Sequence, residues 1–189
     1  MKTEQKNAGD FMNLEDKLYK LQMAMADIED IKNDLLELSN STLLAFDLRS
    51  DDGDEEAQNT LYDSARDIFE TLSFCHNLLD VSFYKLVNLV KDMGNMSLED
   101  QLNKVDMARN NIGVVKNNLY DLKDDIFIAI DDVKEQISFE LQNDLYDRAH
   151  EFCFTIETAR DILGDAEAGL LKVSDDIKKG LLTQNWRVV

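Results

Sequence analysis

Apolar residues recur every three to four positions along most of this chain, which is the spacing of an amphipathic α-helix. In the first such stretch, two interleaved and largely apolar series each repeat every seven positions. The series are Leu14, Leu21, Ile28, Leu35 and Thr42, and Ala24, Ile31, Leu38 and Ala45. This pattern predicts a long helix that packs at a shallow angle on its neighbours.

The same pattern returns 84 positions later in the chain. The stretch NLEDKLYKLQMA, which begins at Asn13, reappears as SLEDQLNKVDMA, which begins at Ser97. Residues 11–94 and 95–178 align without a gap and share 26 identities in 84 positions. A second helical pattern follows the first in each half. Its apolar positions are Leu61, Ala65, Ile68, Leu72, Cys75, Leu79 and Leu86, matched by Leu145, Ala149, Phe152, Ile156, Ala159, Leu163 and Leu170. We therefore predict a tandem duplication of an αα-hairpin of about 84 residues.

The repeated phrase marks the start of a helix. Asn13 and Ser97 stand where an N-cap residue is expected, and each is followed three positions later by an aspartate. A capping side-chain oxygen satisfies an unpaired backbone N–H, and acids in the first turn suit the positive end of the helix dipole. Between the halves, Gly94 is expected to stop one helix before the next cap.

The expected fold is an all-α four-helix bundle with up-down-up-down topology and pseudo-twofold symmetry. Residues 11–94 form the first hairpin, residues 95–178 the second, and residues 179–189 an apolar C-terminal tail. The first hairpin turns at SDDGDEE (50–56), and the second turns at the weakly marked KEQISFE (134–140). Helices of about 30 to 40 residues would give a rod about 50 Å long. Two hairpins exchanged between chains of a dimer remain the alternative arrangement.

Composition narrows the class of function. The chain has no proline, and its formal charge of −19 repels phosphate backbones and anionic membranes, which argues against direct nucleic-acid or lipid binding. The N-terminal residues lack the apolar core of a secretory signal, and no apolar run approaches the roughly 18 residues of a membrane span. We expect a cytoplasmic protein. Cys75 and Cys153 stand in apolar positions and are expected to be buried thiols.

Catalytic and metal-binding patterns are missing from the sequence. The nearest approach to a Glu-x-x-His metal motif is Asp147 followed by His150, but the counterpart of His150 in the first half is Arg66, which cannot bind a metal. Gly-rich phosphate loops and nucleophile motifs are absent as well. We therefore expect no catalytic residues, no cofactor and no metal, and we expect a non-enzymatic protein.

The two halves differ most in their second helices. FCHNLLDVSFYKLVNLV (74–90) is apolar around most of its circumference, whereas its counterpart TARDILGDAEAGLLKVS (158–174) is clearly amphipathic. A bundle helix needs one apolar stripe, so the surplus predicts a second covered surface. The candidate interface residues are Phe74, Val81, Phe83, Tyr84 and Trp186. Either the chain's own terminal segments, a second copy of the chain or another protein could cover them, and we expect a protein partner, possibly in a homodimer.

The acidic residues suggest a rival function. One dense cluster comprises Asp51, Asp52, Asp54, Glu55 and Glu56. Such a cluster is ordinarily a solvated surface that favours solubility. It could also occupy a basic cleft on a partner, as an inhibitor that imitates a nucleic-acid backbone would do.

Overall fold

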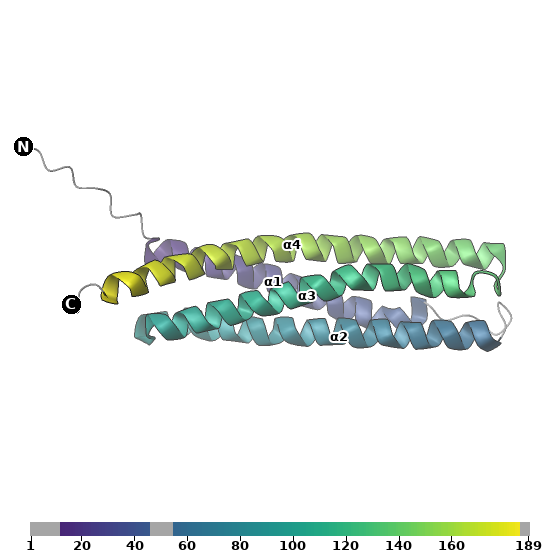
Figure 1. Cartoon of the computed structure of the whole chain (residues 1–189), viewed down its shortest axis with the longest axis horizontal. Coiled ribbons are helices and arrows are strands. Elements are labelled where there is room, and N and C mark those ends of the chain that lie inside the picture. Colours follow the sequence, from purple (N-terminus) through teal and green to yellow (C-terminus); the bar gives the residue numbers. More distant parts are fainter. Residues whose placement is uncertain (1–11, 46–54, 186–189) are drawn as a thin grey trace, which may run out of the picture.

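The computed structural model describes residues 12–45 and 55–185 and confirms the all-α four-helix bundle. The long helices are α1 (Leu14–Ala45), α2 (Glu55–Asp92), α3 (Leu98–Val133) and α4 (Phe139–Asn185), and a short 3₁₀ helix, η1 (Met93–Asn95), links α2 to α3. Successive helices run in opposite directions along one elongated bundle (Figure 1). Each helix packs against its neighbour in the chain, and α1 also packs against α4, so the four helices enclose one core.

The core consists of the residues that the heptad pattern singles out. On α1, Leu21, Ile28 and Leu35 are fully buried, and the positions 84 residues later on α3 are fully buried as well. The equivalent pairs are Leu21 and Val105, Ile28 and Ile112, Leu35 and Leu119, Leu61 and Leu145, Leu79 and Leu163, and Leu86 and Leu170. Burial of each such side chain stabilises the fold by about 1.5–3 kcal/mol, so these positions supply much of the hydrophobic driving force.

Both predicted N-caps are present. The Asn13 side-chain oxygen accepts the Asp16 N–H at 2.7 Å, and the Ser97 hydroxyl oxygen accepts the Asp100 N–H at 3.1 Å. The Ser97 hydroxyl in turn donates to the Asp100 carboxylate at 2.7 Å. Each contact satisfies a backbone donor that the first turn of a helix leaves unpaired.

The junction between the halves differs from the expected glycine stop. Gly94 lies in η1 and does not have a positive φ, so it is not the left-handed residue that commonly ends a helix. The Gln101 side chain instead donates to the carbonyl oxygens of Met93 and Met96, at 2.9 and 3.2 Å. A buried glutamine from the next helix thus satisfies carbonyls that follow α2. The weakly marked second turn is confirmed, because α3 ends at Val133 and α4 begins at Phe139.

The region expected to be a tail begins as helix. Residues 179–185 continue α4, which is therefore 47 residues long and extends for about 70 Å, longer than expected. Leu181 packs against the core, and a Cβ atom on Gly180 would lie 3.2 Å from the Leu98 side chain. The last turns of α4 thus lie against the start of α3. Among the described residues, no helix combines the length and the apolarity that a lipid bilayer requires of a span.

Candidate functional site

Cross-helix polar contacts tie α1 to α2 and α3 to α4 at equivalent positions. Lys32 on α1 lies 3.0 Å from the Asp80 carboxylate of α2, and its ammonium group lies 5.0 Å from the centre of the Phe83 ring. Its counterpart Lys116 lies 2.9 Å from the Glu167 carboxylate of α4. Glu167 occupies the position that corresponds to Phe83. In the first hairpin, Lys32 therefore contacts both an acid and an aromatic ring. In the second hairpin, Lys116 contacts an acid that stands at the position corresponding to the aromatic residue.

The contact with Lys32 distinguishes Phe83 from the other candidate interface residues. Phe83 is half-buried, packs against the core and meets the Tyr84 ring edge-to-face at 6.0 Å. Its apolar surface is thus covered largely within the chain, by the core below and by Lys32 above. Trp186 lies outside the described residues. The exposed candidates are Phe74, Val81 and Tyr84.

The exposed stripe of α2 carries no charge over four turns. Phe74 is 50% exposed, Val81 46% and Tyr84 60%, and the other exposed residues between positions 74 and 88 are Asn77 and Asn88. Exposed acidic side chains are frequent on the other helix surfaces of this chain of charge −19, although single apolar residues such as Tyr19 and Phe154 are exposed there too. A neutral, partly aromatic stripe in this setting is a distinct surface feature.

A second neutral stripe lies on α3. Its exposed residues between positions 103 and 120 are Asn103, Met107, Asn110, Val114, Asn117 and Tyr120. Met107 is 46% exposed and Val114 44%. The Asn111 amide donates to the Ser82 hydroxyl at 3.0 Å, which places Val81 and Val114 within one helical turn of the same α2–α3 contact. We call Phe74, Asn77, Val81, Met107, Asn110 and Val114 the neutral face.

The bundle does not require this face to be apolar. In the other half, the counterpart of Val81 is Asp165 and that of Val114 is Asp30, and both aspartates are exposed. Burial raises the pKa of Asp27 nearby, and the charges of Asp165 and Asp30 raise it further. The α1–α4 surface therefore accumulates negative charge at the positions where the α2–α3 surface has valine. Met107 and Val114 were not foreseen from the sequence, although asparagines spaced seven apart around them were a readable signal.

Two surface hollows lie at equivalent places near the end where α3 turns into α4. One, of about 460 Å³, lies between α1 and α4 and is lined by Asp34, Glu37 and Glu151 together with Arg148. The other, of about 290 Å³, lies between α2 and α3, and its charged lining residues are Asp67, Asp125 and Asp132.

Carboxylates around both hollows repel one another. Burial raises the pKa of Asp34, and Asp30 and Glu37 add to this shift; burial likewise raises the pKa of Asp125, with additions from neighbouring aspartates. Within the described residues, no group of three or more His, Cys, Asp and Glu side chains is arranged to hold a metal ion. The hollows thus offer negative charge to the outside and are not built as chelating sites.

The predicted acidic cluster is only partly described. Glu55 and Glu56 are exposed in the first turn of α2, where they suit the positive end of the helix dipole. Asp51, Asp52 and Asp54 lie outside the described residues.

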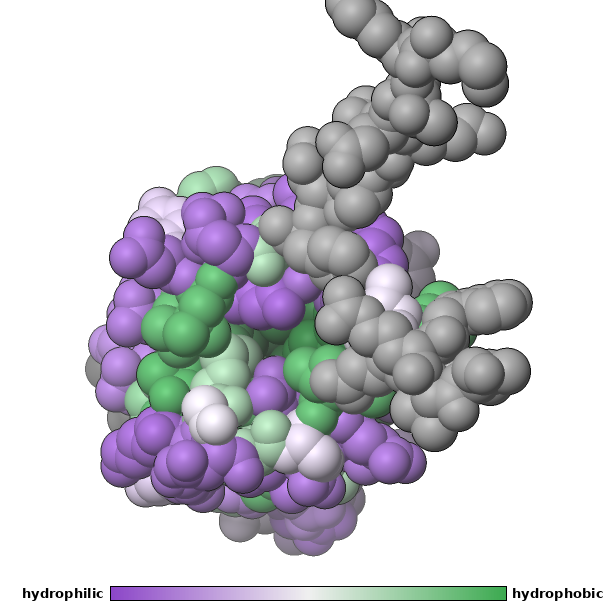
Figure 2. All heavy atoms as spheres, turned by 90° about the vertical axis from the view of Figure 1, so that its left-hand side faces the viewer, coloured by the Kyte–Doolittle hydropathy of each residue, from purple (hydrophilic) through white to green (hydrophobic). Residues whose placement is uncertain are grey.

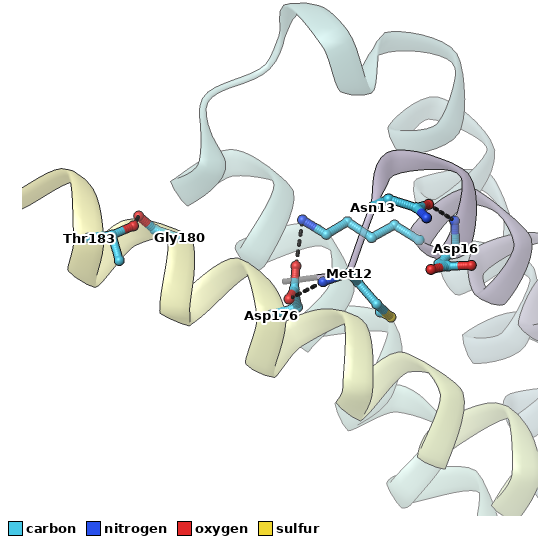
Figure 3. A network of polar contacts seen from close by, with 7 residues as sticks. Met12, Asn13, Asp16, Asp176, Gly180 and Thr183 are labelled. Atoms are coloured by element: carbon cyan, nitrogen blue, oxygen red, sulfur yellow. Dashed lines mark hydrogen bonds and ion pairs between the residues drawn. The ribbon is translucent and has the colours of Figure 1, made fainter. Parts of the chain in front are cut away.

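A buried ion pair ties the first residues of the bundle to α4 (Figure 3). The Asp176 carboxylate accepts the Met12 N–H at 2.8 Å and lies 2.6 Å from the Lys17 ammonium group. Burial alone would raise the pKa of Asp176, but the hydrogen bonds from Lys17 and Met12 outweigh it and hold the pKa below its usual value. Seen from this end, apolar residues fill the middle of the bundle and hydrophilic residues surround them (Figure 2). The hydrogen bond to Asp176 fixes Met12 against α4, away from the α2–α3 contact.

The cysteines are both buried thiols. Burial raises the pKa of Cys75 to about 12 and that of Cys153 to about 11. Neither thiol is therefore activated as a nucleophile near neutral pH. No protein-family model, curated protein or solved structure matches this chain, so the geometry of the bundle and the chemistry of its surface carry the argument for function.

Proposed function

We propose that this protein is a non-enzymatic, acidic helical interaction module of the cytoplasm that associates with itself through the neutral face of α2 and α3. The observation that carries the proposal is the run of exposed, uncharged residues from Phe74 to Asn88, beside Met107 and Val114. Apolar side chains that are half-exposed on two adjacent helices gain free energy when a partner removes them from water.

The charge of the chain favours a second copy at this face. Two molecules of charge −19 repel one another, and the repulsion is strongest where exposed carboxylates would meet. The neutral face is a region where two copies can touch without opposing exposed acids. Salt at physiological concentration screens the remaining repulsion beyond about 8 Å. Contact at this face therefore combines apolar burial with low electrostatic cost.

The proposal includes an origin by duplication of the αα-hairpin. Equivalent core positions are buried in both halves, and Asn13 and Ser97 cap equivalent helices. Lys32 and Lys116 also make cross-helix ion pairs from equivalent positions. These likenesses support a common ancestor for the halves, with the difference between Val81 and Asp165 arising later at the surface.

Light scattering on a sizing column tests self-association directly. We expect a mass near 2 × 21.7 = 43.4 kDa, rather than that of one chain. Val81→Asp introduces the residue that the chain already has at Asp165, so we expect this variant to keep its helical circular dichroism and become monomeric. Leu171→Glu, at a similarly exposed position of α4, is the matched control and should stay dimeric. A monomeric wild type, or a Val81→Asp variant that still dimerises, would contradict the proposal.

The second candidate function is an acidic inhibitor that occupies a basic cleft. The exposed Glu55 and Glu56 and the aspartates around the α2–α3 hollow favour it. The two functions respond to salt in opposite directions. Screening weakens the attraction between an acidic protein and a basic partner, whereas it relieves the repulsion between two acidic copies. Sedimentation of the protein alone from low to high salt should show a rising dimer fraction if the neutral face is the interface.

A further inference from the structure

We propose that two copies pair through the neutral face about a twofold axis perpendicular to the helices, with α2 lying antiparallel on α2 of the second copy and α3 on α3. The axis passes at the level of Val81. This inference rests on the proposed self-association and adds the geometry of the contact, including the part that α3 plays in it.

The two neutral stripes share one centre. The stripe on α2 spans positions 74–88, and its midpoint is Val81. The stripe on α3 spans positions 103–117, because Tyr120 packs against Arg160 of α4, and its midpoint is Asn110. The hydrogen bond between Asn111 and Ser82 places both midpoints at the same level of the bundle. A twofold axis at that level superposes each stripe on its own counterpart, which is the condition for a self-complementary interface.

The charges on either side of the stripes select the antiparallel arrangement. Exposed Asp63, Asp67, Asp125 and Asp132 lie on α2 and α3 beyond the neutral stripes, toward the turn between α3 and α4. If the axis ran along the helices instead, α2 would face α3 of the second copy at the same level, and Asp67 would oppose Asp125 and Asp132. Like charges that oppose one another in an interface cost several kcal/mol. The arrangement in which the helices of the two copies run parallel is therefore disfavoured.

The antiparallel arrangement moves Asp63 and Asp67 beyond the end of the second copy's α2. An axis at position 81 superposes position 92, the end of α2, on position 70 of the second copy, because 92 + 70 = 2 × 81. Asp63 and Asp67 then lie beyond the end of the second copy's α2. Asp125 and Asp132 lie beside them, since Asp67, Asp125 and Asp132 line one hollow. Exposed Glu70 and Asp92 of opposite copies still meet at each end of the contact, and exposed Asp121 lies near its edge, so the antiparallel arrangement reduces the number of opposed acids to those at the ends.

The overlap is large enough for a stable dimer. Residues 70–92 of α2 extend for about 35 Å, and two helices about 10 Å apart present a face about 20 Å wide. The product is about 700 Å² for each copy, close to the roughly 800 Å² per partner of a standard-size interface. The acidic ends project from the two opposite ends of such an assembly and remain available to solvent.

Cysteine cross-linking tests the arrangement. Val81→Cys places a thiol at the proposed axis, where it meets its own counterpart, and the native thiols are buried with raised pKa values. With a short bismaleimide, we expect Val81→Cys to form covalent dimers roughly 100-fold faster than Leu171→Cys at about 10 µM protein. This ratio reflects a millimolar effective concentration inside the dimer against chance collisions. Wild-type protein treated in the same way should stay uncrosslinked.

The outcomes separate this inference from the proposed function. Rapid self-cross-linking of Val81→Cys supports the antiparallel axis. If the wild type is a dimer by light scattering but Val81→Cys cross-links only when mixed with Val114→Cys, then α2 lies on α3 of the second copy and the proposed axis is wrong, while self-association stands. A dimer that gives neither product overturns the neutral face as the interface. A monomer overturns both proposals.

Discussion

Replacing Lys17 with methionine should destabilise the bundle by leaving the Asp176 carboxylate buried without its cation. The Asp176 side chain is 6% exposed and that of Lys17 17%, and their charged atoms lie 2.6 Å apart. Methionine keeps most of the length of the lysine stem and its packing, so Lys17→Met removes mainly the charge. The Met12 N–H remains as a hydrogen-bond donor to the Asp176 carboxylate.

The magnitude follows from the degree of burial. Removal of one partner from a fully buried ion pair costs about 3–5 kcal/mol. Lys17 is partly exposed, so water can reach the vacated position, and we expect a loss of about 2 kcal/mol. For a chain of this length, that loss corresponds to a fall in Tm of about 4–8 °C. Lys17→Met combined with Asp176→Leu should recover most of the stability, because the buried charge is then gone.

Urea unfolding followed by circular dichroism at one fixed protein concentration measures the wild type, Lys17→Met, Asp176→Leu and the double variant, and the four values give the coupling energy. The pKa of Asp176 is lowered in the folded state, so its contribution is present above the unfolded pKa of about 3.9 and is lost as the pH falls through the folded pKa. The cost of Lys17→Met should therefore be full at pH 7 and should shrink below about pH 3.9. A cost under about 0.5 kcal/mol at pH 7, or one that does not change with pH, would refute a buried ion pair here.

Two further changes probe individual helices by the same urea assay. Ser97→Ala removes the acceptor of the Asp100 N–H and should cost about 1 kcal/mol, whereas an unchanged stability would mean that the cap contributes nothing in solution. Gly113→Ala should stabilise the chain by about 1 kcal/mol, because Gly113 lies inside α3 and its added Cβ would meet the nearest atom, of Glu167, at 4.0 Å. A loss of stability in the second variant would show that the contact at Glu167 is tighter than this distance implies.

The sequence predicted the parts of the structure that local periodicity determines. Leu21, Ile28 and Leu35 mark the buried side of α1 because seven residues span nearly two helical turns, so a heptad series stays on one face. The caps at Asn13 and Ser97 were also readable, since a cap acts on its own first turn. Both features depend on neighbours within a few residues, and the sequence displays those directly.

Features that depend on distant partners were not readable. Phe83 and Tyr84 are adjacent in sequence, but only the packing of α1 against α2 shows that Lys32 covers Phe83 and leaves Tyr84 exposed. The pairing of Lys17 with Asp176 joins residues from opposite ends of the chain. Gln101 satisfies the carbonyl oxygens of Met93 and Met96 from inside the next helix, and the pattern around Gly94 does not signal this contact. In each case the determining contact comes from another helix.

The surface of the bundle follows a different rule from its core. At core positions the two halves have the same kind of residue, because any four-helix bundle must fill the same interior volume. At two surface positions the halves differ in charge: Val81 corresponds to Asp165, and Val114 corresponds to Asp30. All four side chains lie at the edges of helix–helix contacts that have the same topology. The topology of the bundle therefore does not by itself require valine at these positions. Hydration favours an exposed aspartate and does not favour an exposed valine. A bundle that has no partner would therefore be expected to have the residues of the α1–α4 surface. The α2–α3 surface departs from that expectation over four turns of both its helices, and the proposed self-association, which would remove this surface from water, offers a physical reason for the departure.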